Sequence, residues 1–170
     1  QEKTEGELHE TRIKLDELET AFKDHASKLS STFDRLLSLE RHSREFNLRF
    51  YGIPETSKED CIVKLKDILN TNLGLHPQIE NAHRIGGHRN DGKPRPIIAK
   101  FLHRPERHQI FIKRKELANG IWISEDLIWE DRQKKKQLRN IMQEAYNRGQ
   151  KPRFHHGSLY IDGHKYTHNH

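Results

Sequence analysis

Polar and apolar side chains alternate in one short stretch, Asn47-Leu48-Arg49-Phe50-Tyr51. In a β-strand this alternation places Leu48 and Phe50 on one face and the amide, guanidinium and phenol on the other. Such groups can hydrogen-bond to phosphates and stack on a base. The stretch therefore suits a sheet that binds nucleic acid, and it suits equally an ordinary half-buried strand with a solvated face.

More cations that could bind phosphates follow. Arg84 lies in a predicted strand over 78–85, and Arg95 and Lys100 flank or occupy a predicted strand over 96–102, after a basic loop. The third strand lacks the glycine and aromatic spacing of the usual RNP1 consensus. We therefore expect Tyr51 to stack one base and the cations to bind the backbone, with little sequence preference.

A predicted helix opened by Ser124 adds a second basic surface. At 100° per residue its apolar arc holds Leu138, Ile141, Met142 and Ala145, and the adjacent arc holds Arg132, Lys135, Lys136 and Arg139. We expect the apolar arc to pack on the domain and the four cations to face outward. A solvated charged face is the alternative. Two short strands, 153–156 and 158–161, and a tight turn at Asp162-Gly163 follow.

The middle of the chain predicts a βαββαβ order. A capping-box-like start at Ser57-Lys58-Glu59-Asp60 opens the first helix, and Gly74 ends it. Pro105 opens the second helix, and Ile121-Trp122-Ile123 forms a short fourth strand. This order predicts an α+β fold of the ferredoxin-like type that RNA-recognition motifs share.

The first 45 residues carry a seven-residue repeat. One apolar series is Leu8, Leu15, Phe22, Leu29 and Leu36, and the positions three further on are Thr11, Leu18, His25, Thr32 and Leu39. With these series at heptad positions a and d, the segment predicts a coiled coil. A single helix folded back on the domain is the weaker alternative, because its length of about 65 Å would overhang a small domain.

The end of this segment indicates how many helices assemble. Arg35-Leu36-Leu37-Ser38-Leu39-Glu40 resembles the Arg-h-x-x-h-Glu pattern of parallel trimeric coiled coils. Arg35 at g can fork onto Glu40 at e of a neighbouring helix while its stem covers the seam. We expect a parallel homotrimer rather than a dimer, held by Leu8, Leu15, Leu18, Phe22, Leu29, Arg35, Leu36, Leu39 and Glu40.

Charge divides along the chain. Residues 1–45 hold 8 Lys and Arg against 11 Asp and Glu, a net of −3, and residues 46–170 hold 23 against 14, a net of +9. The basic part favours a polyanionic partner. The single cysteine, Cys61, excludes an internal disulfide and fits a reducing compartment. No apolar run long enough for a bilayer is present, so we expect no membrane partner.

An enzyme is not expected. Histidines such as His155, His156, His164, His168 and His170 lie in a turn-rich tail, where solvation is the simplest interpretation. The chain has no His-Glu-x-x-His helix, no glycine-rich phosphate loop and no recognisable nucleophile context. We predict no catalytic residue, no cofactor and no metal. Since the chain opens with Gln1 rather than methionine, we expect it to be a piece of a longer protein.

Three runs share a further pattern. Residues 47–55 fit Asn-Leu-Arg-hydrophobic-x-Gly-hydrophobic-Pro-Glu, and residues 93–101, with 82–86 upstream, fit Pro-Arg-x-Ile-Ile-hydrophobic-basic-Phe. Pro152-Arg153 with residues 159–163 fits a C-terminal strand region. Together with the heptads, and in the same order, these runs resemble the first-open-reading-frame protein of LINE-type non-LTR retrotransposons. The resemblance implies three parts: a coiled coil over 1–45, an RNA-recognition-motif-like domain over 46–124 and a C-terminal domain over 125–170.

The resemblance also implies a function. Members of this family are homotrimers that prefer single-stranded RNA, coat retroelement RNA and act as nucleic-acid chaperones. It implies RNA contacts for Asn47, Arg49, Arg95 and Arg153, single-stranded DNA as a further partner, and a cytoplasmic ribonucleoprotein with access to the nucleus. We expect one strand to contact both the sheet and the basic helix. A coiled-coil scaffold with a protein-binding head is the alternative, but it does not explain the cations after residue 46.

Overall fold

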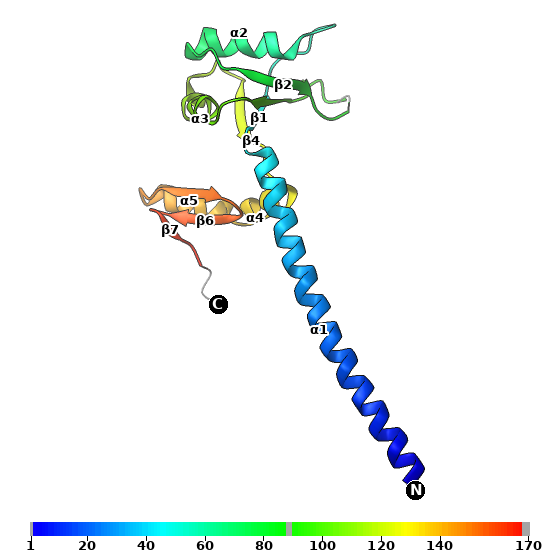
Figure 1. Cartoon of the computed structure of the whole chain (residues 1–170). Coiled ribbons are helices and arrows are strands. Elements are labelled where there is room, and N and C mark those ends of the chain that lie inside the picture. The colour runs from blue at the N-terminus through cyan, green and yellow to red at the C-terminus, as the bar shows by residue number, and fades with distance from the viewer. Residues whose placement is uncertain (1, 88–89, 168–170) are drawn as a thin grey trace. The chain divides into compact units, whose positions relative to one another are not determined.

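The computed structural model describes residues 2–87 and 90–167 of the 170-residue chain. The chain divides into two compact units, Gln1–Glu40 and Arg41–His170. The first is a single helical segment, and the second holds two antiparallel sheets with their own helices (Figure 1). The predicted α+β class and the long N-terminal helix are confirmed.

Helix α1, Glu2–Arg44, is continuous (Figure 1). Ion pairs between residues four apart line its surface, namely Glu10–Lys14 at 2.6 Å, Glu19–Lys23 at 2.7 Å and Asp24–Lys28 at 2.8 Å. Such pairs each stabilise an exposed helix by only about 0.3–0.5 kcal/mol. These ion pairs do not account for the predicted apolar seam, whose side chains are exposed in the single chain.

The larger sheet is built from four strands. In chain order the elements are β1 Asn47–Tyr51, α2 Cys61–Leu73, β2 Ile79–Arg84, β3 Ile97–Phe101, α3 Arg104–Ile112, the short helix η1 Lys113–Glu116, and β4 Trp122–Glu125. The strands lie in the order β2-β3-β1-β4, and every neighbouring pair is antiparallel. Both neighbours of β1, which are β3 and the edge strand β4, therefore come from later in the chain.

Alternation along the strands builds the core. Leu48 and Phe50 of β1 are fully buried with Leu65 and Leu69 of α2 and Ile110 of α3, so both helices cover the same face of the sheet. Burying a side chain of this size contributes about 1.5–3 kcal/mol. The polar side chains of the same strands lie on the opposite face of the sheet.

The start of α2 differs from the expectation. Asp60, rather than Ser57, is the N-cap, and its carboxylate accepts hydrogen bonds from the backbone N–H of Ile62 at 2.9 Å and Val63 at 3.1 Å. Glu59 lies outside the helix and binds other groups. The predicted end is confirmed, since Gly74 caps the helix in the left-handed conformation, with φ 63°.

The C-terminal part holds α4 Trp129–Gln137, α5 Arg139–Asn147, β5 Pro152–His155, β6 Ser158–Ile161 and β7 His164–Lys165 (Figure 1). The predicted single helix capped by Ser124 is wrong. Ser124 pairs with Arg49 in β4, and the helix begins only at Trp129. The helical path is interrupted at Leu138 alone, whose N–H still donates to the Lys134 carbonyl at 3.0 Å.

The predicted C-terminal hairpin is confirmed. Asp162 and Gly163 have φ values of 51° and 85°, which are the two positive values that a tight turn between antiparallel strands needs. The inner side chains Phe154 and Leu159 are buried with Ala145 of α5. The small sheet β5-β6-β7 thus has one covered face and one outer face.

Candidate nucleic-acid interface

One face of the four-stranded sheet carries polar and aromatic groups opposite the helices. Residues that pair directly across antiparallel strands lie on the same face. The pairings Asn47–Lys100, Arg49–Ser124 and Tyr51–Trp122 therefore gather the predicted β1 residues with partners from β3 and β4. We call this set the polar face; it consists of Asn47, Arg49, Tyr51, Lys100, Trp122 and Ser124.

An aromatic pair stands at one end of the polar face. The rings of Tyr51 and Trp122 lie parallel within 3°, with centroids 3.7 Å apart, and Trp122 is 55% exposed. Ser124 Oγ lies 3.4 Å from the Tyr51 hydroxyl oxygen. Because each ring covers one face of the other, the pair forms a single stacking surface rather than two.

A close backbone approach holds this pair in place. Gly52 follows Tyr51, has φ 77°, and lies so near the Gly120 carbonyl that a Cβ on Gly52 would sit 1.7 Å from that oxygen. Gly120 stands two residues before Trp122. A glycine at position 52 is therefore what allows the two aromatic residues to face each other across β1 and β4.

Trp122 was not among the binding residues predicted from the sequence. The available signal was the alternation in Ile121-Trp122-Ile123, where a tryptophan occupies the position that faces away from the core. Four residues are too few for periodicity alone to assign a face.

Asn47 and Arg49, two polar-face residues that we predicted to contact RNA, bind the carboxylate of Asp126 in the same chain. Asp126 is buried, and its oxygens accept from Arg49 Nε at 2.7 Å, Arg49 Nη2 at 2.6 Å and Asn47 Nδ2 at 2.9 Å. Arg44 Nη1 lies 3.6 Å from the same carboxylate. Two guanidinium groups thus approach the same buried carboxylate.

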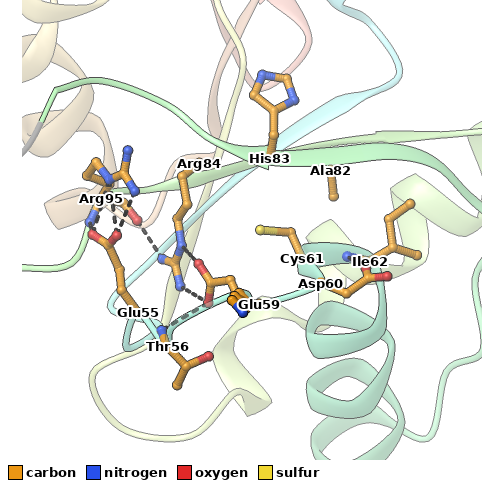
Figure 2. Close-up of a pocket in the computed structure, with 11 residues that line it drawn as sticks. Glu55, Thr56, Glu59, Asp60, Cys61, Ile62, Ala82, His83, Arg84 and Arg95 are labelled. Atoms are coloured by element: carbon orange, nitrogen blue, oxygen red, sulfur yellow. Dashed lines mark hydrogen bonds and ion pairs between the residues drawn. The ribbon is translucent and has the colours of Figure 1, made fainter.

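The guanidinium of Arg84 is taken up by contacts within its own chain. Its side chain is only 6% exposed, and it donates to Glu59 Oε1 at 2.6 Å and to the carbonyl oxygens of Ile53 at 2.8 Å and Arg95 at 2.6 Å (Figure 2). In β2 it is the neighbouring His83 that is exposed. The prediction of Arg84 as a phosphate ligand therefore conflicts with this placement, because the alternation turns it toward the core side.

The contact with Arg84 also lowers the pKa of Glu59. Its hydrogen bonds to the charged form lower the pKa of Glu59 from 4.5 to about 2. A second pair lies beside it: Arg95 Nη2 and Glu55 Oε2 are 2.8 Å apart, and Arg95 lowers the pKa of Glu55 to about 2 as well (Figure 2). These four residues form a charge network along a shallow hollow between β2 and the start of α2.

Lys100 is paired more loosely. Its Nζ lies 3.0 Å from a Glu80 carboxylate oxygen, and both side chains are nearly half exposed. An exposed pair of this kind contributes about 0–1 kcal/mol. A phosphate can therefore compete for Lys100 at small cost.

The C-terminal cations differ from those of the four-stranded sheet. Arg132, Lys136, Arg139 and Arg153 are exposed, and within the described residues none of them has an acidic partner. Lys135 is half-buried and lies 6.0 Å from the centre of the Phe154 ring. Helices α4 and α5 and strand β5 therefore carry a group of cations without an acidic partner within residues 2–87 and 90–167.

The outer face of the small sheet adds an aromatic ring to this charge. Arg153 pairs with Tyr160, and Tyr160 pairs with Lys165 on its other side, so the phenol lies between two cations. His155 shares that face, and burial and the neighbouring His156 lower its pKa. Tyr160 was not among the binding residues predicted from the sequence, although it alternates with the apolar Leu159 and Ile161.

In comparisons with known proteins, no family model and no curated protein matches this chain. The chemical interpretation of the site therefore depends on its geometry.

The predicted assembly residues lie along α1. The apolar members of the seam are 58–74% exposed, from Leu36 at 58% to Phe22 at 74%. No other element of the described chain covers them. Exposed leucines repeating at heptad spacing over this length are typical of a helix that buries its seam against other helices.

No described helix is long and apolar enough to cross a membrane. Within residues 2–87 and 90–167, no group of three or more histidine, cysteine or acidic side chains in one chain is arranged around a common metal position.

Proposed function

We propose that this chain binds single-stranded RNA, and single-stranded DNA, with little sequence preference as part of a parallel homotrimer. The observation that carries the proposal is the set of C-terminal cations, Arg132, Lys135, Lys136, Arg139 and Arg153, which have no acidic partner in the described chain. Phosphates supply the missing negative charge and release counterions on binding.

Aromatic surfaces support single strands over duplexes. The Tyr51–Trp122 pair offers one exposed stacking surface, and Tyr160 lies between Arg153 and Lys165 on the outer face of the small sheet. Unpaired bases stack on such rings irrespective of base identity, whereas bases in a duplex are already stacked. Stacking and phosphate contacts together give affinity without a sequence code.

The fold proposal is an RNA-recognition-motif-like domain over residues 46–124. Its support is the βαββαβ element order, the antiparallel sheet β2-β3-β1-β4, and two helices on one face with aromatic and basic groups on the other. In RNA-recognition motifs the sheet face opposite the helices binds the bases.

The proposed trimer multiplies these contacts. Joining three basic heads converts the second and third binding events into intramolecular ones with a high effective concentration. Each contact is weak and exchanges independently, so bound strands can rearrange. This behaviour fits a nucleic-acid chaperone that coats a retroelement RNA as a cytoplasmic ribonucleoprotein with access to the nucleus, without chemistry of its own.

The test is fluorescence anisotropy of an unrelated single-stranded RNA over a salt series. We expect a steep salt slope that is similar for different sequences. The variant R132Q/K136Q/R139Q/R153Q should reduce the slope by about 2–3, since each lost phosphate contact on a single strand removes about 0.7.

The matched control is K28Q/K58Q/K66Q/K115Q, which removes four exposed lysines outside the proposed interface. It should leave the slope nearly unchanged. Equal losses in both variants would show that total charge, not this surface, drives binding. Undetectable binding at low salt would instead favour the scaffold alternative, in which the basic head binds a protein.

A further inference from the structure

Three polar side chains occupy d positions in the α1 seam: Thr11, His25 and Thr32. The two threonines are satisfied within their own helix. Thr11 Oγ1 donates to the Glu7 carbonyl at 2.7 Å, and Thr32 Oγ1 donates to the Lys28 carbonyl at 2.8 Å.

His25 differs from both. Its imidazole has no hydrogen-bond or ion-pair partner among the described residues of the chain. The nearest charged side chains, Asp24 and Lys28, pair with each other at 2.8 Å. Assembly of the seam would therefore bury an imidazole for which its own helix supplies no partner.

The core layers next to His25 are apolar, with Phe22 and Leu29 at the a positions on either side. In the heptad register Ala26 is at e, and the g positions before and after His25 are Ala21 and Lys28, whose ammonium group is paired with Asp24. Imidazole nitrogen is a common ligand of zinc-class ions.

We propose that the assembled coiled coil binds one divalent ion of the zinc class at the His25 layer, with one imidazole nitrogen from each of the three chains. Three histidines and a water complete a tetrahedral zinc site. The inference rests on the proposed trimer, because a single chain contributes only one ligand. Binding would couple assembly to the metal, since the ion holds only the associated state together.

The experiment uses the full chain and Co²⁺, whose visible absorption reports four-coordinate geometry. Wild type is compared with His25→Leu, which fills the layer with an apolar side chain, and with His9→Gln, which removes an exposed histidine outside the seam. The difference spectrum between wild type and H25L should saturate at one Co²⁺ per three chains. The H9Q protein should behave as wild type, and histidines elsewhere cancel in the difference.

Sedimentation of the same proteins supplies the second measurement. Zn²⁺ should lower the concentration at which the wild-type trimer dissociates by at least about tenfold, and H25L should remain trimeric without responding to Zn²⁺. A trimer with no His25-dependent Co²⁺ spectrum would overturn the metal site and leave the trimer standing. A monomer or dimer would overturn both. Stabilisation by chloride at acid pH, in place of Zn²⁺, would assign the layer to an anion and overturn the proposal.

Discussion

Arg41 and Asp131 form a two-pronged ion pair between the last turns of α1 and the first turn of α4. Arg41 Nε and Nη2 each lie 2.8 Å from a different oxygen of Asp131, whose side chain is 2% exposed. The β5–β6 turn closes over the pair, since a Cβ on Gly157 would lie 2.8 Å from Asp131 Oδ1. Asp131 is thus a structural carboxylate in the first turn of a helix whose later turns are basic.

Replacing Asp131 with asparagine should destabilise the Arg41–His170 unit by about 3 kcal/mol, because it removes the charge of a buried carboxylate that accepts two hydrogen bonds from Arg41. Urea unfolding followed by tryptophan fluorescence measures the change. The control is E10Q, which breaks the exposed Glu10–Lys14 pair and should change stability by less than about 0.5 kcal/mol. Equal midpoints for wild type and D131N would refute the structural role.

Gly52→Ala should unfold the four-stranded sheet or displace β4, because the added methyl would meet the Gly120 carbonyl. The loss should exceed about 3 kcal/mol. Gly163→Ala is the matched control: it has a similar φ of 85° but an open surrounding, so only backbone strain of about 1–2 kcal/mol is expected. If both variants lost the same stability, the close approach would not matter.

Trp122→Leu should weaken single-stranded RNA binding by about 1–3 kcal/mol through the loss of base stacking. Trp122→Phe keeps an aromatic surface beside Tyr51 and should retain most of the affinity. Anisotropy at a fixed salt concentration measures both, and the salt slope should stay constant because no cation changes. A loss that is identical in the two variants would argue against stacking.

Stability should fall in acid through Glu59. Its pKa in the folded chain, about 2, is below its ordinary value of 4.5, so the Arg84 contact stabilises the fold fully above pH 4.5 and is lost as the pH falls toward 2. The variant E59Q should be less stable at pH 7 and show a shallower decline over this range. Part of the decline should persist, because the pKa of Glu55 is lowered similarly. E17Q, on the exposed surface of α1, should show the wild-type slope.

The predicted seam of α1 can be tested by comparing one position inside it with one position outside it. Leu15 lies at position a and is 63% exposed in the single chain, whereas Ile13 lies at position f and is 46% exposed. Leu15→Asp should abolish the trimer, because it places three carboxylates in one core layer. Ile13→Asp should leave the sedimentation coefficient unchanged. Loss of assembly in both variants would contradict the heptad register.

Local features were predictable from the sequence. The helix at the N-terminus, the strands around Leu48 and Phe50, and the Asp162-Gly163 turn follow from periodicity and turn chemistry, which act between residues close in the chain. The trimer and the RNA contacts remain predictions, because they concern molecules beyond the single chain.

Tertiary structure decided the partners of the charged groups. Ser124 and Glu125 had favourable helix-start chemistry, yet they form a strand because the edge of β1 offers backbone hydrogen bonds. Arg84 was expected at the surface, yet it is enclosed by Glu59 and backbone carbonyls.

The same holds for the aromatic surface. Tyr51 was recognised from its strand, but Trp122, 71 positions later, became part of the site only through pairing across β1 and β4. Alternation along a strand determines which face a side chain takes, and the amino-acid sequence records it directly. Which residue lies beside it depends on strand order and register, and these are set by packing the whole core.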